Sequence, residues 1–279
     1  MEHPASAVSH RRLRWSGHSD CGKVRKNNED SFLGLQFDSR EVHHLGKFGD
    51  ASLAESDFVF AVSDGMGGAA AGEFASRITV EKVTRLLPAA FKQAASELNP
   101  GYEEILSELF DQIHHALLFL GRSYEECSGM GATLSLCWFT PGAMHFGHVG
   151  DSRIYYLPHG QEKLVQVSHD DTHVGWLFRN AKINEREART HPRRNVLQKA
   201  LGAGHQFAEP QVGSVRYESG DRFLLCTDGV VDGLYDATLS ELVRDAGSGI
   251  STKSAPALVK AAVDGSGRDN TTALLIEML

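Results

Sequence analysis

The sequence is poor in cysteine, and its longest uncharged stretch is not typical of a membrane span. Four cysteines among 279 residues, with no C-x-x-C pair, argue against a disulfide framework or a zinc site and favour a cytoplasmic location. Residues 127–150 contain no Lys, Arg, Asp or Glu and are long enough to cross a bilayer. Because a Thr140-Pro141-Gly142 turn interrupts them, we predict two buried strands there and no transmembrane helix.

Positive charge is also scarce, since 28 Lys and Arg face 36 Asp and Glu for a formal charge of −8 at pH 7. Binding along a nucleic-acid backbone needs clustered positive charge, so no nucleic-acid partner is expected. Residues 179–199 are the local exception, because seven Lys or Arg and two Glu give them a net charge of +5. Two interpretations of this basic segment stay open: a solvated helix face, or a flap that faces an anionic substrate.

Short apolar runs and amphipathic stretches follow one another in groups along the chain. Predicted strands cover residues 31–37, 58–63, 132–139, 143–149, 153–157, 222–226 and 271–276. Predicted helices cover residues 71–87, 102–124, 184–190, 236–245 and 255–264. Because the strands come in hairpin-like runs and the helices in pairs, the pattern predicts an α+β fold with antiparallel sheets. The polar residues 38–56 are expected to form a long surface loop.

Four aspartates, Asp64, Asp151, Asp228 and Asp269, each stand at the end of a predicted strand beside Gly or Asn. One Asp-Gly after a strand is usually a turn, but four such sites are less easily dismissed. Carboxylates that converge repel one another unless a cation neutralises them, and their oxygens suit Mg²⁺ or Mn²⁺. Two such ions about 3.5–4 Å apart can hold a bridging hydroxide that attacks phosphorus. The spacing alone does not establish that these acids meet.

A charged turn, Arg25-Lys26-Asn27-Asn28-Glu29-Asp30, precedes the first predicted strand. Its arginine offers a planar fork for a phosphate, although charged turns of this composition are common. Other chemistries lack their motifs. Residues 65–70 fit G-x-G-x-x-A, but no acid follows about 20 residues later, as a dinucleotide site requires. The motifs of protein kinases, serine hydrolases and cysteine phosphatases are missing as well.

Six motifs occur together in one order. They are Arg25-x-x-Asn28-Glu29-Asp30, Asp64-Gly65-Met66-Gly67-Gly68, Gly129-Met130-Gly131-Ala132-Thr133, Gly150-Asp151-Ser152-Arg153, Thr227-Asp228-Gly229 and Asp269-Asn270-Thr271. The set resembles the metal-dependent serine/threonine protein phosphatases of type 2C, and Met66 after Asp-Gly resembles the bacterial form. The resemblance covers residues 12–279 as a single phosphatase domain after an N-terminal tail at 1–11, with a flap at about 171–195.

This resemblance implies a four-layer α-β-β-α sandwich of two antiparallel sheets flanked by paired helices, with metals in a cleft at one end. It also implies two Mg²⁺ or Mn²⁺ ions and a third, weaker one. By matching position, Asp64 bridges the two ions, and the Gly65 carbonyl binds one of them. Asp228 and Asp269 hold the first ion, Glu29 holds the second through water, and Asp151 helps to bind the third. Asp30 orients metal-bound water, and Arg25 clamps the substrate phosphate.

Two departures from the family pattern affect the expected chemistry. Eukaryotic relatives place a histidine after Asp-Gly as a general acid, and Met66 cannot serve, so we expect metal-bound water to donate the proton. Family members usually carry Asp-His-Ser ahead of the flap, whereas this chain reads Asp170-Asp171-Thr172. No role is therefore transferred to these three residues.

The implied function is Mg²⁺- or Mn²⁺-dependent hydrolysis of phosphoserine and phosphothreonine in proteins by a metal-bridging hydroxide. The expected enzyme is a monomer whose partners are phosphorylated proteins, including a serine/threonine kinase that it antagonises or the targets of that kinase. The alternative is a catalytically weak phosphoprotein-binding module on the same fold. Such a module is expected to have lost metal ligands, yet Asp64, Asp228 and Asp269 are all present.

Overall fold

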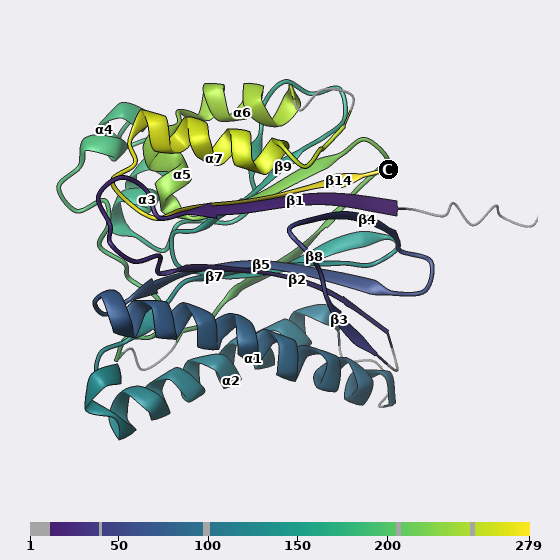
Figure 1. The fold of residues 1–279 in the computed structure, drawn as a ribbon, viewed down its shortest axis with the longest axis horizontal. Helices are drawn as coiled ribbons and strands as arrows, with labels where there is room; N and C mark the ends of the chain where they lie inside the picture. Colours follow the sequence, from purple (N-terminus) through teal and green to yellow (C-terminus); the bar gives the residue numbers. More distant parts are fainter. Residues whose placement is uncertain (1–11, 39–40, 97–100, 205–207, 246–248) are drawn as a thin grey trace, which may run out of the picture.

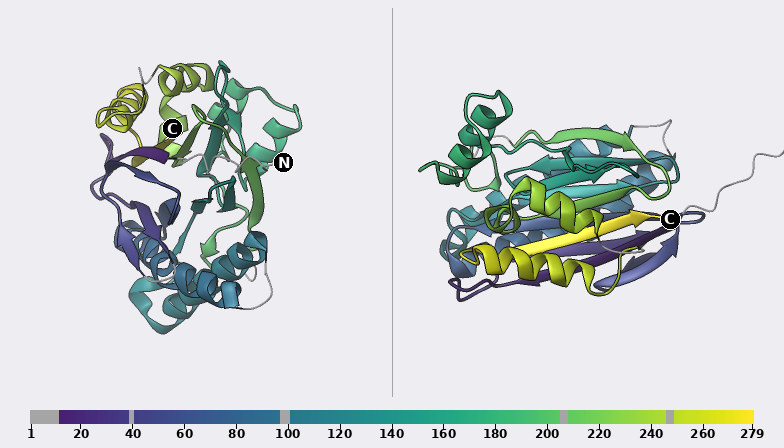
Figure 2. Two further views of the ribbon diagram at one scale, coloured as in Figure 1. Left: turned by 90° about the vertical axis from the view of Figure 1, so that its right-hand side faces the viewer. Right: turned by 90° about the horizontal axis from the view of Figure 1, so that it is seen from above.

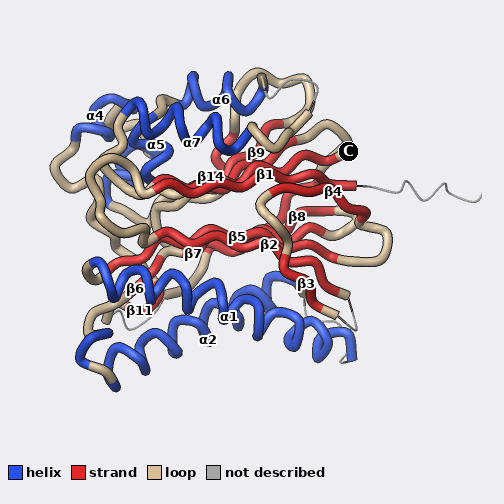
Figure 3. Tube along the Cα trace, in the orientation of Figure 1, coloured by secondary structure: helices blue, strands red, loops and turns tan. Residues whose placement is uncertain are grey.

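Two antiparallel β-sheets lie face to face, and helices cover the outer face of each (Figure 1). This computed structural model describes residues 12–38, 41–96, 101–204, 208–245 and 249–279, so the predicted tail at 1–11 lies outside the described residues. Figure 3, coloured by secondary structure, shows the four layers as helices, strands, strands and helices. The predicted α+β fold, a four-layer α-β-β-α sandwich, is confirmed.

The first sheet has the strand order β10-β9-β13-β14-β1-β4. Its strands are β1 (Arg12–Asp20), β4 (Phe48–Ser52), β9 (Arg153–Leu157), β10 (Val165–Gln166), β13 (Arg222–Cys226) and β14 (Thr271–Met278). The second sheet has the order β11-β6-β5-β7-β8-β12, and β2 lies beside β5 with β3 beyond it. Its strands are β2 (Asp30–Phe37), β3 (Val42–His44), β5 (Asp57–Met66), β6 (Gly131–Ala132), β7 (Leu134–Phe139), β8 (Ala143–Val149), β11 (Leu201–Gly202) and β12 (Gln211–Arg216).

The helices form two outer layers and one group at the end of the sandwich. The second sheet is covered by α1 (Ala69–Ser96) and α2 (Tyr102–Ser123), which a short 3-10 helix, η1 (Glu125–Cys127), follows. The first sheet is covered by α5 (Asp228–Gly233), α6 (Asp236–Arg244) and α7 (Ser254–Gly265). The short α3 (His173–Arg179) and α4 (Glu185–Thr190) lie at one end, at the upper left in the right-hand view of Figure 2. Among the described residues, none of the helices combines the length and apolar character that a bilayer crossing requires.

Strands that are buried on both faces divide their side chains between two cores. In β13, Phe223 and Leu225 lie in the core between the sheets, whereas Leu224 and Cys226 pack with α5, α6 and α7. β5 is divided in the same way between the central core and the helices α1 and α2. Because successive side chains of a strand point to opposite faces, a strand covered on both sides is apolar at every position. This explains the continuous apolar runs from which these strands were predicted.

The prediction that residues 38–56 form a surface loop was wrong. This segment contains β3 and β4, which pair with β2 in one sheet and with β1 in the other. Backbone hydrogen bonds from Leu45 N–H to Gly34 O (2.9 Å) and from Gly17 N–H to Lys47 O (2.7 Å) tie the segment to both sheets. Both strands lie at sheet edges, where side chains stay exposed and polar, and this polarity conceals them in the sequence.

The packing of α2 on the second sheet depends on the small size of Gly147 in β8. A Cβ atom at this position would lie 2.5 Å from Cε2 of the buried Phe110. We predict that Gly147→Ala lowers the free energy of unfolding by about 1–3 kcal/mol, as overpacking of a core does, measured by denaturant titration. Gly142→Ala in the adjacent turn is the control, because an added Cβ meets nothing within 4 Å there. Equal unfolding midpoints for the two variants would contradict this account of the packing.

Candidate metal centre

Seven of the eight predicted site residues line one cleft at the end of the sandwich. They are Arg25, Glu29, Asp64, Gly65, Asp151, Asp228 and Asp269. They come from the turn before β2, from β5, from the turn after β8, from the start of α5 and from the residue pair before β14. The antiparallel pairing explains the convergence, since the end of β13 lies beside the beginning of β14 and the beginning of β2 lies beside the end of β5.

The eighth residue, Asp30, lies in the protein interior, directly opposite Asp64 in the β2–β5 pairing. Its Oδ2 accepts hydrogen bonds from the hydroxyls of Thr227 and Thr272, each at 2.7 Å. Its Oδ1 is buried and has no hydrogen-bond partner in the described part of the chain. Burial raises the pKa of Asp30 to about 7, although the two hydroxyl contacts act in the opposite direction.

Asp64 is held through its backbone by Thr133. The Asp64 N–H donates to the Thr133 hydroxyl at 2.9 Å, and the Thr133 N–H donates to the Asp64 carbonyl at 2.8 Å. The same hydroxyl lies 2.8 Å from that of Ser152, next to Asp151. One buried hydroxyl pair therefore connects the backbone of Asp64 with the turn that carries Asp151. Asp64 lies inside β5, which continues to Met66, and not at the strand end that the sequence predicted.

The turn that carries Arg25 and Glu29 is fixed by Asn270. The Asn270 side chain accepts the Glu29 N–H at 2.8 Å and donates to the carbonyls of Cys21 (3.0 Å) and Asn27 (2.9 Å). Arg25, about half exposed, donates from Nη2 to Asp269 Oδ2 at 2.8 Å, so its guanidinium lies at the rim of the cleft. Asn270 belongs to the Asp-Asn-Thr motif, but its hydrogen bonds to the backbone of this turn were not predicted.

Gly65 is required by a close approach of two backbone segments. A Cβ atom at Gly65 would lie 1.9 Å from the carbonyl oxygen of Gly72 in α1. The Gly65 N–H also donates to the Glu29 carbonyl at 3.2 Å. The Asp64-Gly65 peptide can therefore pass between the first turn of α1 and the Glu29 turn only because position 65 has no side chain.

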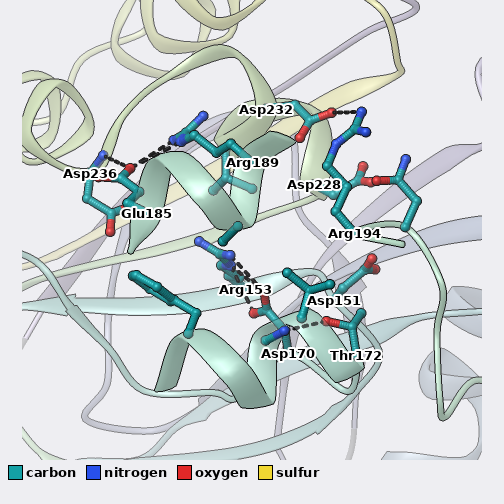
Figure 4. Close-up of a pocket in the computed structure, with 16 residues that line it drawn as sticks. Asp151, Arg153, Asp170, Thr172, Glu185, Arg189, Arg194, Asp228, Asp232 and Asp236 are labelled. Atoms are coloured by element: carbon teal, nitrogen blue, oxygen red, sulfur yellow. Dashed lines mark hydrogen bonds and ion pairs between the residues drawn. The ribbon is translucent and has the colours of Figure 1, made fainter. Parts of the chain in front are cut away.

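A second, smaller cavity of about 80 Å³ adjoins the cleft between α3, α4, α5 and α6 (Figure 4). Asp151 and Asp228 line both hollows. Six of the residues that line the second cavity form three ion pairs, Arg153–Asp170, Arg189–Glu185 and Arg194–Asp232. The first pair is largely buried, and the Arg153 Nε and Nη2 atoms reach Asp170 at 2.7–3.2 Å. Two arginines of the basic segment are thus paired with acids beside the cleft.

The cleft concentrates uncompensated negative charge. Burial, followed by repulsion from neighbouring carboxylates, raises the pKa values of Asp64 and Asp228 well above their ordinary range. One oxygen of Asp228, Oδ1, is buried and accepts no hydrogen bond from any residue that the structure describes. Within the described ranges, no three His, Cys, Asp or Glu side chains surround a single point closely enough to form a complete ligand shell. The donors are all oxygens, and a hard divalent cation that keeps several waters fits them.

These carboxylates predict an unusual pH dependence of stability. The folded protein binds the Asp30 proton up to about pH 7, whereas an unfolded Asp releases it near 3.9, so the stabilisation by this proton is lost as the pH rises through about 7. Asp64 shifts in the same direction. In chelator, Asp64→Asn should therefore raise Tm over the parent by about 3 °C or more at pH 8 and by less at pH 5, measured by scanning calorimetry.

Mn²⁺ should raise the Tm of the parent protein and have a smaller effect on Asp64→Asn. Asp111→Asn, at an exposed position of α2, is the matched control and should leave Tm unchanged at both pH values. A destabilised Asp64→Asn at pH 8 in chelator would contradict the electrostatic account of the cleft.

Comparison with known proteins gives a consistent family assignment. The family model described as protein phosphatase 2C matches residues 47–263. The serine/threonine protein phosphatase PstP of Mycobacterium tuberculosis is 32% identical over 270 residues, which are 96% of this chain and 45% of PstP, so the chain spans under half of that relative. The serine/threonine phosphatase stp of Listeria innocua is 30% identical over 262 residues, 93% of each chain.

A crystal structure of the PstP catalytic domain in complex with two manganese ions has the same fold. It is 29% identical in sequence, covers 96% of this chain and 99% of that domain, and has a TM-score of 0.74. The chain therefore belongs to the protein phosphatase 2C family, beside these bacterial serine/threonine phosphatases.

Proposed function

We propose that this protein is a Mg²⁺- or Mn²⁺-dependent phosphatase that hydrolyses phosphoserine and phosphothreonine in proteins. The observation that carries the proposal is the cleft in which four aspartates, one glutamate and one exposed arginine meet. Oxygen ligands for hard cations stand there beside a guanidinium that can bind a phosphate. The relatives PstP and stp, which are serine/threonine phosphatases, and the two manganese ions of the PstP domain support the same reaction.

In this proposal the chain supplies the ligands for two ions and a weaker third. Asp64 would be shared by the two, Gly65 would offer its carbonyl, and Asp228 and Asp269 would complete the first. Glu29 would hold the second through water, and Asp151 would contribute to the third. When bound, the ions would supply Lewis acidity and activate water for attack on phosphorus.

The remaining residues bind the phosphate and orient water. Arg25 binds two phosphate oxygens with its planar guanidinium group. Its side chain is about half exposed, so it can reach a phosphate in the cleft. Asp30 orients water through Oδ1, the carboxylate oxygen that has no hydrogen-bond partner among the described residues. Met66 lines the cleft, and none of the described residues lining it is a histidine, so the proton for the leaving alkoxide comes from water.

The basic segment 179–199 is proposed to attract phosphoproteins. Arg179, Lys182, Arg186 and Arg193 are exposed and form no ion pair with a described residue, unlike Arg189 and Arg194. Exposed, unpaired cations beside a cleft raise the local concentration of anionic substrates. We further propose a monomeric, cytoplasmic enzyme that reverses the action of a serine/threonine kinase.

The test of the reaction is hydrolysis of an aryl phosphate with Mn²⁺, with and without EDTA. Asp64→Asn and Asp228→Asn should each lower kcat by about 100-fold or more, since even the loss of outer-shell partners of a metal costs 10- to 100-fold. Asp111→Asn on α2 is the matched control and should retain full activity. Turnover that survives EDTA, or persists in both cleft variants, would overturn the mechanism. Tight binding of a phosphopeptide without turnover in Mn²⁺ would favour the alternative of a binding module.

The phosphate clamp has a separate test at Arg25. Arg25→Ala should lower kcat/KM by roughly 10- to 100-fold, because a charge-assisted hydrogen bond contributes about 1.5–3 kcal/mol. Arg25→Lys should recover only part of this loss, since an ammonium group cannot make two parallel contacts. Steady-state kinetics on a phosphopeptide measure both effects. Equal activity of the parent and Arg25→Ala would remove Arg25 from the phosphate site.

A further inference from the structure

Asp171 stands where three segments of the chain meet. It lies between Asp170, which pairs with Arg153, and Thr172, whose hydroxyl caps the start of α3 (Figure 4). The three segments are the turn after β8, the beginning of the flap segment (residues 171–195), and residues 195–198, which close the flap segment and are called its end below. Asp171 occupies the position at which family members usually carry a histidine, and its contacts account for what the aspartate does there.

The first contact is a double hydrogen bond to Gly150. Oδ2 of Asp171 accepts the Gly150 N–H at 3.0 Å, and the Asp171 N–H donates to the Gly150 carbonyl at 2.7 Å. Gly150 adopts φ +114°, and an added Cβ would lie 2.5 Å from Cγ2 of Thr133. The glycine is thus held in a left-handed conformation between Thr133 and Asp171. Asp151, the next residue, takes its position from this peptide.

The second contact is with the end of the flap segment. The Gln198 N–H donates to the Asp171 carbonyl at 2.7 Å, and Thr172 and Leu197 form an isolated antiparallel bridge. Asn195 and Leu197 line the metal cleft. Asp171 therefore holds the Asp151 turn with its side chain and holds the end of the flap segment beside the cleft with its backbone carbonyl.

The third contact fixes the carboxylate itself. The Gln211 side chain on β12 donates to Oδ1 of Asp171 at 3.3 Å and to the His169 carbonyl at 2.6 Å. Its own carbonyl oxygen accepts the His169 N–H at 2.8 Å. Both carboxylate oxygens of Asp171 therefore accept hydrogen bonds from protein groups, which fixes the orientation of the side chain.

We propose that Asp171 is a positioning residue that fixes the Asp151 turn and the cleft-lining end of the flap segment as one unit. Loosening this residue loosens both walls together, so ion binding at Asp151 and binding of protein substrates depend on it. The substrate and ion consequences rest on the proposed function, whereas the mechanical linkage does not.

The experiment compares Asp171→Ala with Asp221→Ala and Asp171→Asn. Asp221 is the matched control, because it is buried and accepts the backbone N–H groups of His159 (2.7 Å) and Glu218 (2.8 Å) at the other end of β13. Hydrogen exchange followed by mass spectrometry should be about tenfold faster in both 148–153 and 195–199 for Asp171→Ala. Asp221→Ala should leave both segments unchanged. Asp171→Asn keeps an oxygen for the Gly150 N–H but loses the contact with Gln211, so its exchange should lie between that of the parent and that of Asp171→Ala.

Two functional measurements separate positioning from general weakening. A Mn²⁺ titration of Asp171→Ala should show the weakest class of sites weakened about fivefold, with the tighter sites unchanged. KM for a phosphopeptide should rise about fivefold, while kcat on an aryl phosphate at saturating Mn²⁺ stays within about twofold of the parent.

Faster exchange in only one of the two segments, or equal effects of Asp171→Ala and Asp221→Ala, would overturn the proposal. If Asp171→Ala does not fold, Gln211→Ala replaces it, and unchanged exchange in that folded variant would overturn the proposal equally. The exchange measurement needs no turnover. A parent protein that hydrolyses no phosphate would therefore refute the proposed function and leave the linkage to be judged on exchange alone.

Discussion

Repulsion among the buried carboxylates at one end of the sandwich is the constraint on which the rest of the site depends. Asp64 and Asp228 each lie in the electrostatic field of several other acids, and burial removes the water that would screen them. Buried acids that repel one another stay close together only if other contacts hold the backbone segments that carry them. Neutral donors supply those contacts here: Thr133 for Asp64, Asn270 for Glu29, and Thr227 with Thr272 for Asp30. Because these donors are uncharged, they hold the acids in place without neutralising them.

The sandwich makes this arrangement possible because its central strands are covered on both faces. β5 and β13 are anchored by apolar side chains in two cores, so their ends can carry charge without freedom to separate. The antiparallel pairing brings the ends of strands far apart in sequence to the same edge. The apolar packing of the two cores therefore offsets the electrostatic repulsion at the cleft, as is common where function opposes stability.

Most central strands and the main helices could be predicted, because a strand or helix that is buried carries its periodicity in its own residues. The central strand β1 was missed, because its sequence, RLRWSGHSD, is largely polar although it lies between β14 and β4. The edge strands β3, β4 and β12 could not, since one of their faces or edges meets solvent and their composition is polar. The acids of the cleft stood out through the Asp-Gly pairs beside strands, yet only the fold brings them together. The supporting residues Thr133, Asn270 and Asp171 act through hydrogen bonds to backbone atoms of distant segments. Thr133 and Asn270 belong to recognised motifs, but which backbone atoms they contact could be known only from the fold.

The charge of the basic segment acquires a different meaning once its partners are known. Arg189 donates to the Leu234 carbonyl, Arg194 pairs with Asp232, and Lys199 donates to the Glu209 carbonyl, so these three cations hold the segment in place. The four remaining cations, Arg179, Lys182, Arg186 and Arg193, are exposed to solvent. If every cation of the segment were used to hold it in place, none would be left to attract an anionic partner. If none were used in this way, the unpaired cations would repel one another. The division between paired and unpaired cations therefore satisfies both requirements, attachment beside an acidic cleft and attraction of phosphorylated chains to it.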